Sequence, residues 1–147
     1  MSFFQSEHER IAGELQTLHG EYRRLARQIE SHVDAAPYPQ VADRLRKLVE
    51  EGEQNARRIA DRLVVLGRHL RDEDAGPIRG GRNSWERLVV DLEDYRGLLR
   101  RLSGLWTRWD DEHPEDAALV HALRDSAVSH REEVVDLLAR SDPHALD

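Results

Sequence analysis

The sequence predicts an all-α protein folded as a four-helix bundle. Leu, Ala, Arg and Glu dominate the chain, whereas Thr and Phe are scarce, and this composition favours helices over strands. Four long segments repeat apolar residues at spacings of three and four, as amphipathic helices do. Breaks rich in proline, glycine and acidic residues separate these segments at 35–40, 67–84 and 111–116. We therefore expect one domain over residues 1–147, because 147 residues suffice for a single core.

The first helix is expected over about residues 6–34. Ser6 and Glu9 have the spacing of a capping box, in which each side chain bonds to the other's backbone N–H. The apolar positions that follow form one stripe along the helix. They are Ile11, Leu15, Leu18, Tyr22, Leu25 and Ile29.

The second helix is expected over about residues 39–70. Pro39 suits a first helical turn, where its missing N–H has no helical partner to lose. The stripe that would face the core contains one glycine and one asparagine among aliphatic residues. It consists of Val41, Leu45, Leu48, Gly52, Asn55, Ile59, Leu63 and Leu66.

The third and fourth helices are expected over about residues 84–112 and 114–140. Asn83 precedes the third helix, with Glu86 three residues later, and Pro114 opens the fourth. The stripe of the third helix consists of Trp85, Leu88, Leu92, Tyr95, Leu98 or Leu99, Leu102 and Trp106. That of the fourth consists of Val120, Leu123, Ala127, His130, Val134, Leu137 and Leu138.

The two halves of the chain are similar to each other. GEYRRLARQI (20–29) aligns with EDYRGLLRRL (93–102), and residues 41–63 align with residues 116–138. Two repeated hairpins joined by a crossover need a connection as long as the bundle. Residues 68–83 can stretch to roughly 50 Å, and a helix of about 28 residues is about 42 Å long. The sequence therefore favours a crossover, with an up-down-up-down bundle as the alternative.

Composition limits the classes of partner. The net charge is −7, and acidic and basic residues alternate along every segment, so we expect no nucleic-acid binding. No apolar run is long enough to span a bilayer, and the first residues do not form a signal peptide, so a soluble cytoplasmic protein without membrane contact is expected. The absence of cysteine excludes disulfides, thiolate metal sites and cysteine nucleophiles.

Two hairpins, a long middle connection and a tyrosine on the first and third helices resemble the ferritin-like superfamily, especially its rubrerythrin-type members, over about residues 6–140. The resemblance implies an interior site for two iron or manganese ions. In such bundles two helices each supply a Glu, and the other two each supply Glu-x-x-His.

The sequence departs from this ligand pattern. None of the eight histidines has Glu three residues before it. Ala127 and His130 occupy the expected pair on the fourth helix, and Gly52 and Asn55 occupy the aligned pair on the second. We therefore expect the dimetal site to be lost and no cofactor to be bound. The alternative is an iron or manganese site of unusual composition. Its candidate ligands are Glu21, Glu51 and His130.

Four polar residues of the stripes are expected at one level of the bundle, judged by their distance from the hairpin turns. They are Tyr22, Asn55, Tyr95 and His130. Buried hydroxyl, amide and imidazole groups need hydrogen-bond partners, so we expect them to form a buried polar cluster. Such a layer would fix the register of the helices; a ligand-binding site is the alternative interpretation.

These patterns favour a non-enzymatic bundle that acts through self-association, as a homodimer, or through a protein partner. Trp85, Trp106 and Trp109 gather on the third helix and suit either core packing or a contact surface. No nucleophile elbow or phosphate-binding loop is present, so the sequence leans against an enzyme. The alternatives are a dimetal carboxylate protein of oxidase or iron-handling type and a bundle with a small-molecule cavity.

Overall fold

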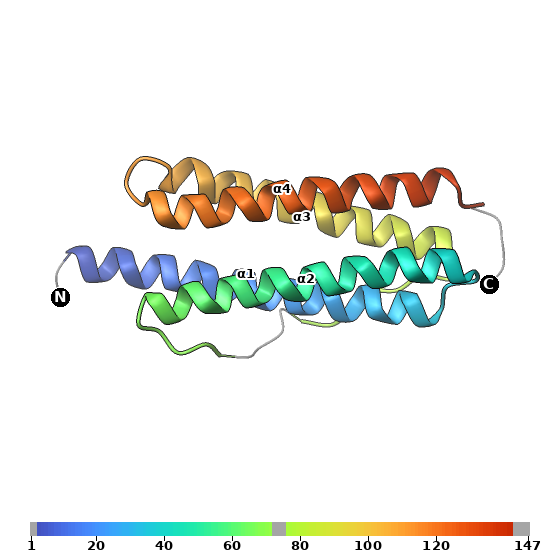
Figure 1. Ribbon diagram of the computed structural model, residues 1–147, viewed down its shortest axis with the longest axis horizontal. Helices are drawn as coiled ribbons and strands as arrows, with labels where there is room; N and C mark the ends of the chain where they lie inside the picture. The colour runs from blue at the N-terminus through green and yellow to red at the C-terminus, as the bar shows by residue number, and fades with distance from the viewer. Residues whose placement is uncertain (1–2, 72–75, 143–147) are drawn as a thin grey trace.

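The computed structural model describes residues 3–71 and 76–142, and within them the chain forms four long helices. These are α1 (Phe3–Asp34), α2 (Pro39–Val65), α3 (Ser84–Trp109) and α4 (Pro114–Ala139). All four run along the long axis of the molecule and pack side by side as a bundle (Figure 1). None of the described helices is long and apolar enough to cross a membrane.

The starts of three helices follow the predicted signals. Pro39 and Pro114 lie in the first turns of α2 and α4, where a proline costs no helical hydrogen bond. The Asn83 side chain accepts a hydrogen bond of 2.8 Å from the backbone N–H of Glu86, which caps α3. The capping box expected at Ser6 is wrong, because α1 already begins at Phe3 and Ser6 lies inside the helix.

Two helices end earlier than expected, and the backbone at Gly67 explains the end of α2. α2 ends at Val65 instead of residue 70, because Gly67 takes a left-handed conformation with φ of 73°. The N–H of Gly67 bonds to the Val64 carbonyl and that of Arg68 to the Leu63 carbonyl, as in a Schellman motif. α3 ends at Trp109 instead of residue 112, and a turn over residues 110–112 leads from it to the start of α4.

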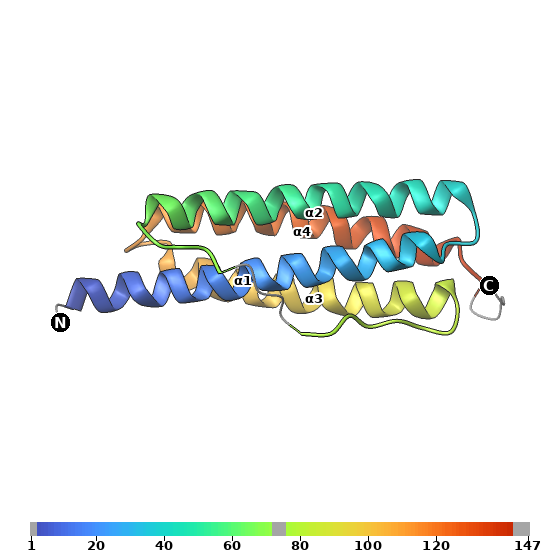
Figure 2. The ribbon, with the colours of Figure 1, turned by 90° about the horizontal axis from the view of Figure 1, so that it is seen from below.

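The helices form two antiparallel hairpins, α1 with α2 and α3 with α4. α2 ends and α3 begins at opposite ends of the bundle, so the connection between them returns along its length (Figures 1 and 2). α1 consequently packs beside α3 and α2 beside α4. The crossover is therefore the topology of this chain, and the up-down-up-down alternative is wrong.

The predicted stripes meet in the core between the hairpins. Tyr22 and Tyr95 occupy equivalent positions of the repeat, and both are buried. The same holds for Asn55 and His130. Aliphatic side chains from every helix make up most of the core. Its most completely buried apolar side chains are Leu15, Leu18, Ile29, Ile59, Leu63, Leu88, Leu102, Leu105, Leu123, Val120 and Val134.

The connection is hydrogen-bonded to α1 at both of its described ends. The side-chain amide of Gln16 both donates to the carbonyl and accepts from the N–H of Arg71. Further along, the side-chain carbonyl oxygen of Gln28 accepts from the backbone N–H of Arg79 at 2.8 Å. Arg27 also donates to the Gly76 carbonyl at 3.3 Å. Two glutamines of one helix therefore hold the backbone of the connection, one near each end of its path.

Replacing Gln28 should cost far more stability than replacing Gln16. Gln28 is fully buried and bonded to charged side chains, so Gln28→Leu should lower the free energy of unfolding by about 2–3 kcal/mol. Gln16 is half-exposed, so water can take over its hydrogen bonds to Arg71, and Gln16→Leu should lower the free energy of unfolding by less than about 1 kcal/mol. Urea denaturation gives both values. Amide hydrogen exchange should also quicken at Arg79 in the Gln28 variant, and unchanged exchange there would contradict this account.

Candidate functional site

The middle of the bundle contains the four polar residues expected there, one from each helix. Tyr22, Asn55, Tyr95 and His130 are all buried, with exposed fractions between 3% and 5%. The rings of Tyr95 and His130 contact each other edge to face, with centroids 5.7 Å apart. This region is the first candidate for a functional site.

The hydrogen bonds of this layer differ from those expected. His130 bonds through Nε2 to Oε2 of Glu51 at 2.6 Å, and Asn55 donates to the Ser126 hydroxyl at 2.9 Å. The Tyr22 hydroxyl is buried without a hydrogen-bond partner among the described residues. The layer is thus two separate side-chain bonds between α2 and α4, beside a tyrosine whose hydroxyl is left unsatisfied.

Of the three residues named as alternative metal ligands, the structure brings two together. Glu51 reaches inward to His130 although its side chain is 38% exposed, so the pair joins the interior to the surface. Glu21 instead forms an ion pair with Arg101 of α3. Burial raises the pKa of Glu21, and the neighbouring Arg101 guanidinium opposes that rise. Glu21 therefore does not belong to the Glu51–His130 pair.

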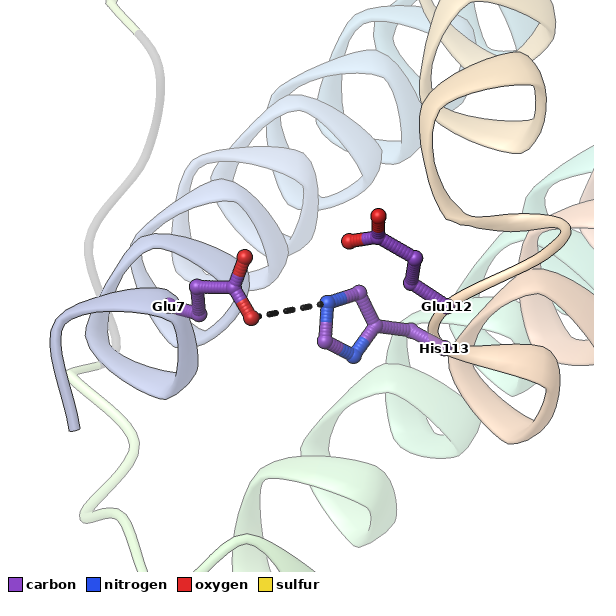
Figure 3. Close-up of side chains that lie close together, drawn as sticks. All are labelled: Glu7, Glu112 and His113. Atoms are coloured by element: carbon purple, nitrogen blue, oxygen red, sulfur yellow. Dashed lines mark ion pairs between the residues drawn. The ribbon is translucent and has the colours of Figure 1, made fainter. Parts of the chain in front are cut away.

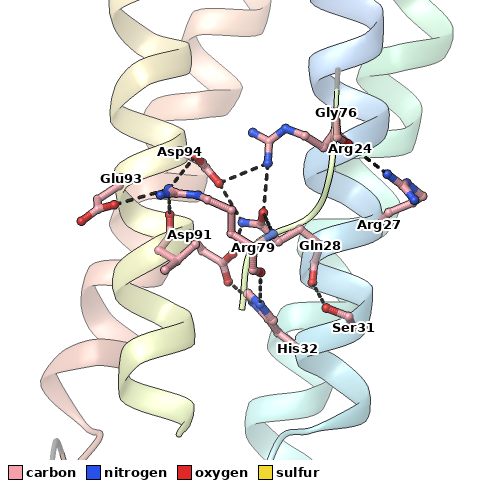
Figure 4. A network of polar contacts seen from close by, with 11 residues as sticks. Arg24, Arg27, Gln28, Ser31, His32, Gly76, Arg79, Asp91, Glu93 and Asp94 are labelled. Atoms are coloured by element: carbon pink, nitrogen blue, oxygen red, sulfur yellow. Dashed lines mark hydrogen bonds and ion pairs between the residues drawn. The ribbon is translucent and has the colours of Figure 1, made fainter. Parts of the chain in front are cut away.

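A second polar site lies between α1 and α3, and Gln28 is its centre (Figure 4). The amide of Gln28 donates to Asp91 at 2.9 Å and to Asp94 at 2.7 Å. Its carbonyl accepts from Arg24 at 2.9 Å and from the N–H of Arg79 at 2.8 Å. Both donors and both acceptor positions of the amide are therefore used.

His32 completes this site beside Gln28. Its Nδ1 lies 2.6 Å from Oδ2 of Asp91, and its Nε2 lies 3.1 Å from the carbonyl oxygen of Arg79. A carbonyl oxygen only accepts, so Nε2 must carry a proton, and a second proton must lie between Nδ1 and the carboxylate. Burial raises the pKa of Asp91, whereas the bond from His32 opposes that rise. The pair therefore binds two protons when both of its bonds are formed.

Sequence reasoning did not single out this second site. Gln28 follows Leu25 by three residues, His32 follows Ile29 by three, and Asp91 precedes Tyr95 by four. Gln28, His32 and Asp91 therefore each lie on the apolar stripe of their helix. This spacing of three or four residues is the signal that predicts their burial. The sequence does not single out Asp91, although its side chain is fully buried.

Among the potential ligands of the two interior sites, Glu51 and His130 bond to each other, and Asp91 is bonded to His32 and Gln28. Within the described residues, the one group of three potential ligands lies elsewhere, at the end of the bundle. It consists of Glu7, Glu112 and His113.

No protein-family sequence pattern matches the chain, and no curated protein is similar to it in sequence. Solved structures do match it. Bacterioferritin BfrA of Mycobacterium tuberculosis is 18% identical with a TM-score of 0.82, over 89% of this chain and 85% of that one. A dodecameric thioferritin of Bacteroides fragilis is 14% identical with a TM-score of 0.81, over 90% and 86%. A Dps protein of Mycobacterium smegmatis is 17% identical with a TM-score of 0.80, over 94% and 99%. The chain therefore has a ferritin-like fold.

Removing the unsatisfied hydroxyl of Tyr22 should stabilise the protein. A buried hydroxyl without a partner costs about 1–3 kcal/mol, so Tyr22→Phe should raise the free energy of unfolding by about 1 kcal/mol. Tyr38 is exposed, so Tyr38→Phe is a matched control that should change nothing. Denaturation of the three proteins at neutral pH tests this. A loss of stability in Tyr22→Phe would show that the hydroxyl has a partner.

The same residue should affect stability at high pH. Burial raises the pKa of both Tyr22 and Tyr95, so these hydroxyls ionise in the unfolded chain before they do so in the folded protein. The free energy of unfolding should therefore fall as the pH rises above about 10, the ordinary pKa of tyrosine. The fall should be shallower in Tyr22→Phe than in the wild type. Denaturation curves between pH 8 and pH 11 would measure it, and equal slopes would contradict the assignment.

Proposed function

We propose that this protein is a non-enzymatic ferritin-like bundle without a dimetal centre, acting through association with copies of itself or with a protein partner. The observation that carries the proposal is the state of the bundle's middle level. There Glu51 and His130 are hydrogen-bonded to each other at 2.6 Å. Aromatic and aliphatic side chains surround it instead of further ligands.

The neighbouring positions support the loss of the ligands that the fold uses elsewhere. Ala127 is buried three residues before His130, where a Glu-x-x-His motif has its carboxylate. Leu18 of α1 and Leu88 of α3 fill the core on the helices that would each supply a Glu. The apolar side chains of Ala127, Leu18 and Leu88 offer no lone pair to a cation. The rubrerythrin-like ligand set is therefore absent from the chain on this proposal.

The carboxylates that do approach the interior are already neutralised by cations of the protein. Asp94 bonds to Arg79 at 2.9 Å and faces Arg24 at 3.5 Å. Glu21 pairs with Arg101. A metal ion entering between α1 and α3 would have to displace these guanidinium groups, and leaving them unpaired costs free energy. The electrostatics of the interior thus support a structural role for the acidic residues.

Apolar side chains on the surface support the association part of the proposal. Val64 and Val65 are adjacent at the end of α2 and are each 70% exposed. Contiguous exposed apolar groups mark contact surfaces more often than isolated ones do. Trp109 is buried in the core, and neither Trp85 nor Trp106 is fully exposed, so the tryptophans are weaker candidates for a contact. The thioferritin that shares the fold is dodecameric, which shows that such bundles can assemble.

Metal binding at the middle of the bundle provides the main test. Protein purified without a histidine tag should bind iron(II) and manganese(II) no more tightly than the His130→Ala variant does, and should not speed the oxidation of iron(II) by oxygen. Elemental analysis after desalting and absorbance during oxidation measure the two properties. Iron or manganese that is stoichiometric in the wild type and lost in His130→Ala would contradict the proposal and favour the dimetal alternative.

The oligomeric state tests the association surface. We expect a wild-type particle larger than one chain, and we expect Val64→Glu together with Val65→Glu to weaken its assembly by about tenfold or more, because each charge would be buried in the contact. Val135→Glu is the control, since Val135 is a single exposed valine on α4. Light scattering over a range of concentrations gives the masses. A wild type that stays monomeric at high concentration would rule out self-association.

A further inference from the structure

A group of metal-ligating side chains lies at the end of the bundle where α1 begins (Figure 3). Glu7 comes from the second turn of α1, whereas Glu112 and His113 come from the turn between α3 and α4. One ligand atom of each residue lies within 4.8 Å of the other two. Two segments that are far apart in the sequence thus direct two carboxylates and one imidazole into the same space.

The spacing of Glu7 and His113 suits a shared metal ion better than a direct bond. Oε2 of Glu7 lies 3.6 Å from Nε2 of His113. This separation is too long for a hydrogen bond between nitrogen and oxygen. Two ligands held about 2.1 Å from one tetrahedral metal ion are separated by about 3.4 Å. The two atoms are therefore close to the positions that they would occupy around a common cation.

The backbone holds His113 in place. Its N–H donates to the carbonyl of Trp109 at 2.8 Å, and its carbonyl accepts from the N–H of Ala117 at 2.9 Å. Trp109 is buried in the core, and Pro114 begins α4 directly after the histidine. The imidazole is consequently presented by a turn that is fixed on both sides. Such preorganisation lowers the entropy cost of binding an ion.

The surroundings leave room and negative charge for a cation. The three side chains line an open pocket of about 510 Å³, which gives water access to the remaining coordination positions. Arg10, Arg101 and Arg108 line the same pocket, and the guanidinium groups of Arg101 and Arg108 face the carboxylate of Glu14, at 3.2 and 3.6 Å. Two of the three arginines are therefore directed to Glu14, and among the described residues none of the three forms an ion pair with Glu7 or Glu112.

We propose that Glu7, Glu112 and His113 form a binding site for one divalent transition-metal ion of the class of Zn²⁺ and Co²⁺. His113 would bind through Nε2 and each glutamate through one oxygen, with water completing the coordination. Mixed nitrogen and oxygen ligands suit these ions, whereas Mg²⁺ and Ca²⁺ prefer oxygen alone. The bound ion would join the beginning of α1 to the turn of the second hairpin. This site is separate from the middle of the bundle and does not depend on the function proposed above.

Titration of the metal-free full-length protein with Co²⁺ tests the proposal. We expect one ion per chain, with visible absorption bands from a mixed nitrogen and oxygen ligand set. His113→Ala, Glu7→Gln and Glu112→Gln should each weaken binding by about tenfold or more, because even the loss of a residue that only hydrogen-bonds to a metal ligand has an effect of this size. Zn²⁺ should compete for the same site, and it should raise the melting temperature of the wild type and not that of His113→Ala.

His121→Ala is the matched control. Nδ1 of His121 also lies 3.6 Å from a carboxylate, that of Asp125, but the pair belongs to no group of three ligands among the described residues. Binding should be unchanged in this variant and in His130→Ala. Binding that is absent from the wild type, or that survives in His113→Ala, would overturn the site and leave the function proposed above intact. Binding that is lost only in His130→Ala would overturn both.

Discussion

The connection between α2 and α3 must return along the whole bundle, and its backbone groups must find partners on the way. The structure meets this requirement with side chains of α1. Gln28 is decisive, because its amide bonds to the connection at Arg79 and to Asp91 and Asp94 of α3 at the same time. One buried side chain thus fixes the path of the crossover and the position of α3 against α1. The antiparallel contact of the two hairpins depends on that arrangement.

This arrangement also determines the electrostatics of the interior. The connection places the guanidinium of Arg79 over Asp94, and its carbonyl accepts from His32, which is bonded to Asp91. The acidic residues between α1 and α3 are thereby satisfied by the protein itself. A bundle of the same fold that binds two metal ions needs its inward carboxylates free of such partners. Under the function proposed above, these polar contacts disfavour a dimetal centre between α1 and α3.

The two levels of the molecule that contain histidine and glutamate differ in what their geometry allows. In the middle, Glu51 and His130 are in direct contact, so Nε2 of His130 and Oε2 of Glu51 are already used in the hydrogen bond between them. At the end of the bundle, Glu7 and His113 are held near each other without reaching hydrogen-bond distance, and a third carboxylate adjoins them. A pair that is hydrogen-bonded to itself stabilises a helix contact, whereas three ligands that are not bonded to one another can accept an ion. The likeness of the fold to bacterioferritins therefore says little about where this chain would bind an ion.

The sequence by itself determined the four helices, their pairing in hairpins and most of the core, because the spacing of apolar residues and the prolines and glycines between them are local properties. It also placed Tyr22, Asn55, Tyr95 and His130 in the interior, where all four are buried. Only the tertiary structure decided the partners of these groups. Register and rotation of one helix against another set whether His130 meets Glu51 or a tyrosine, and no local pattern contains that information. The group at the end of the bundle shows the same limit, since residues 7 and 113 become neighbours only when both hairpins have been assembled.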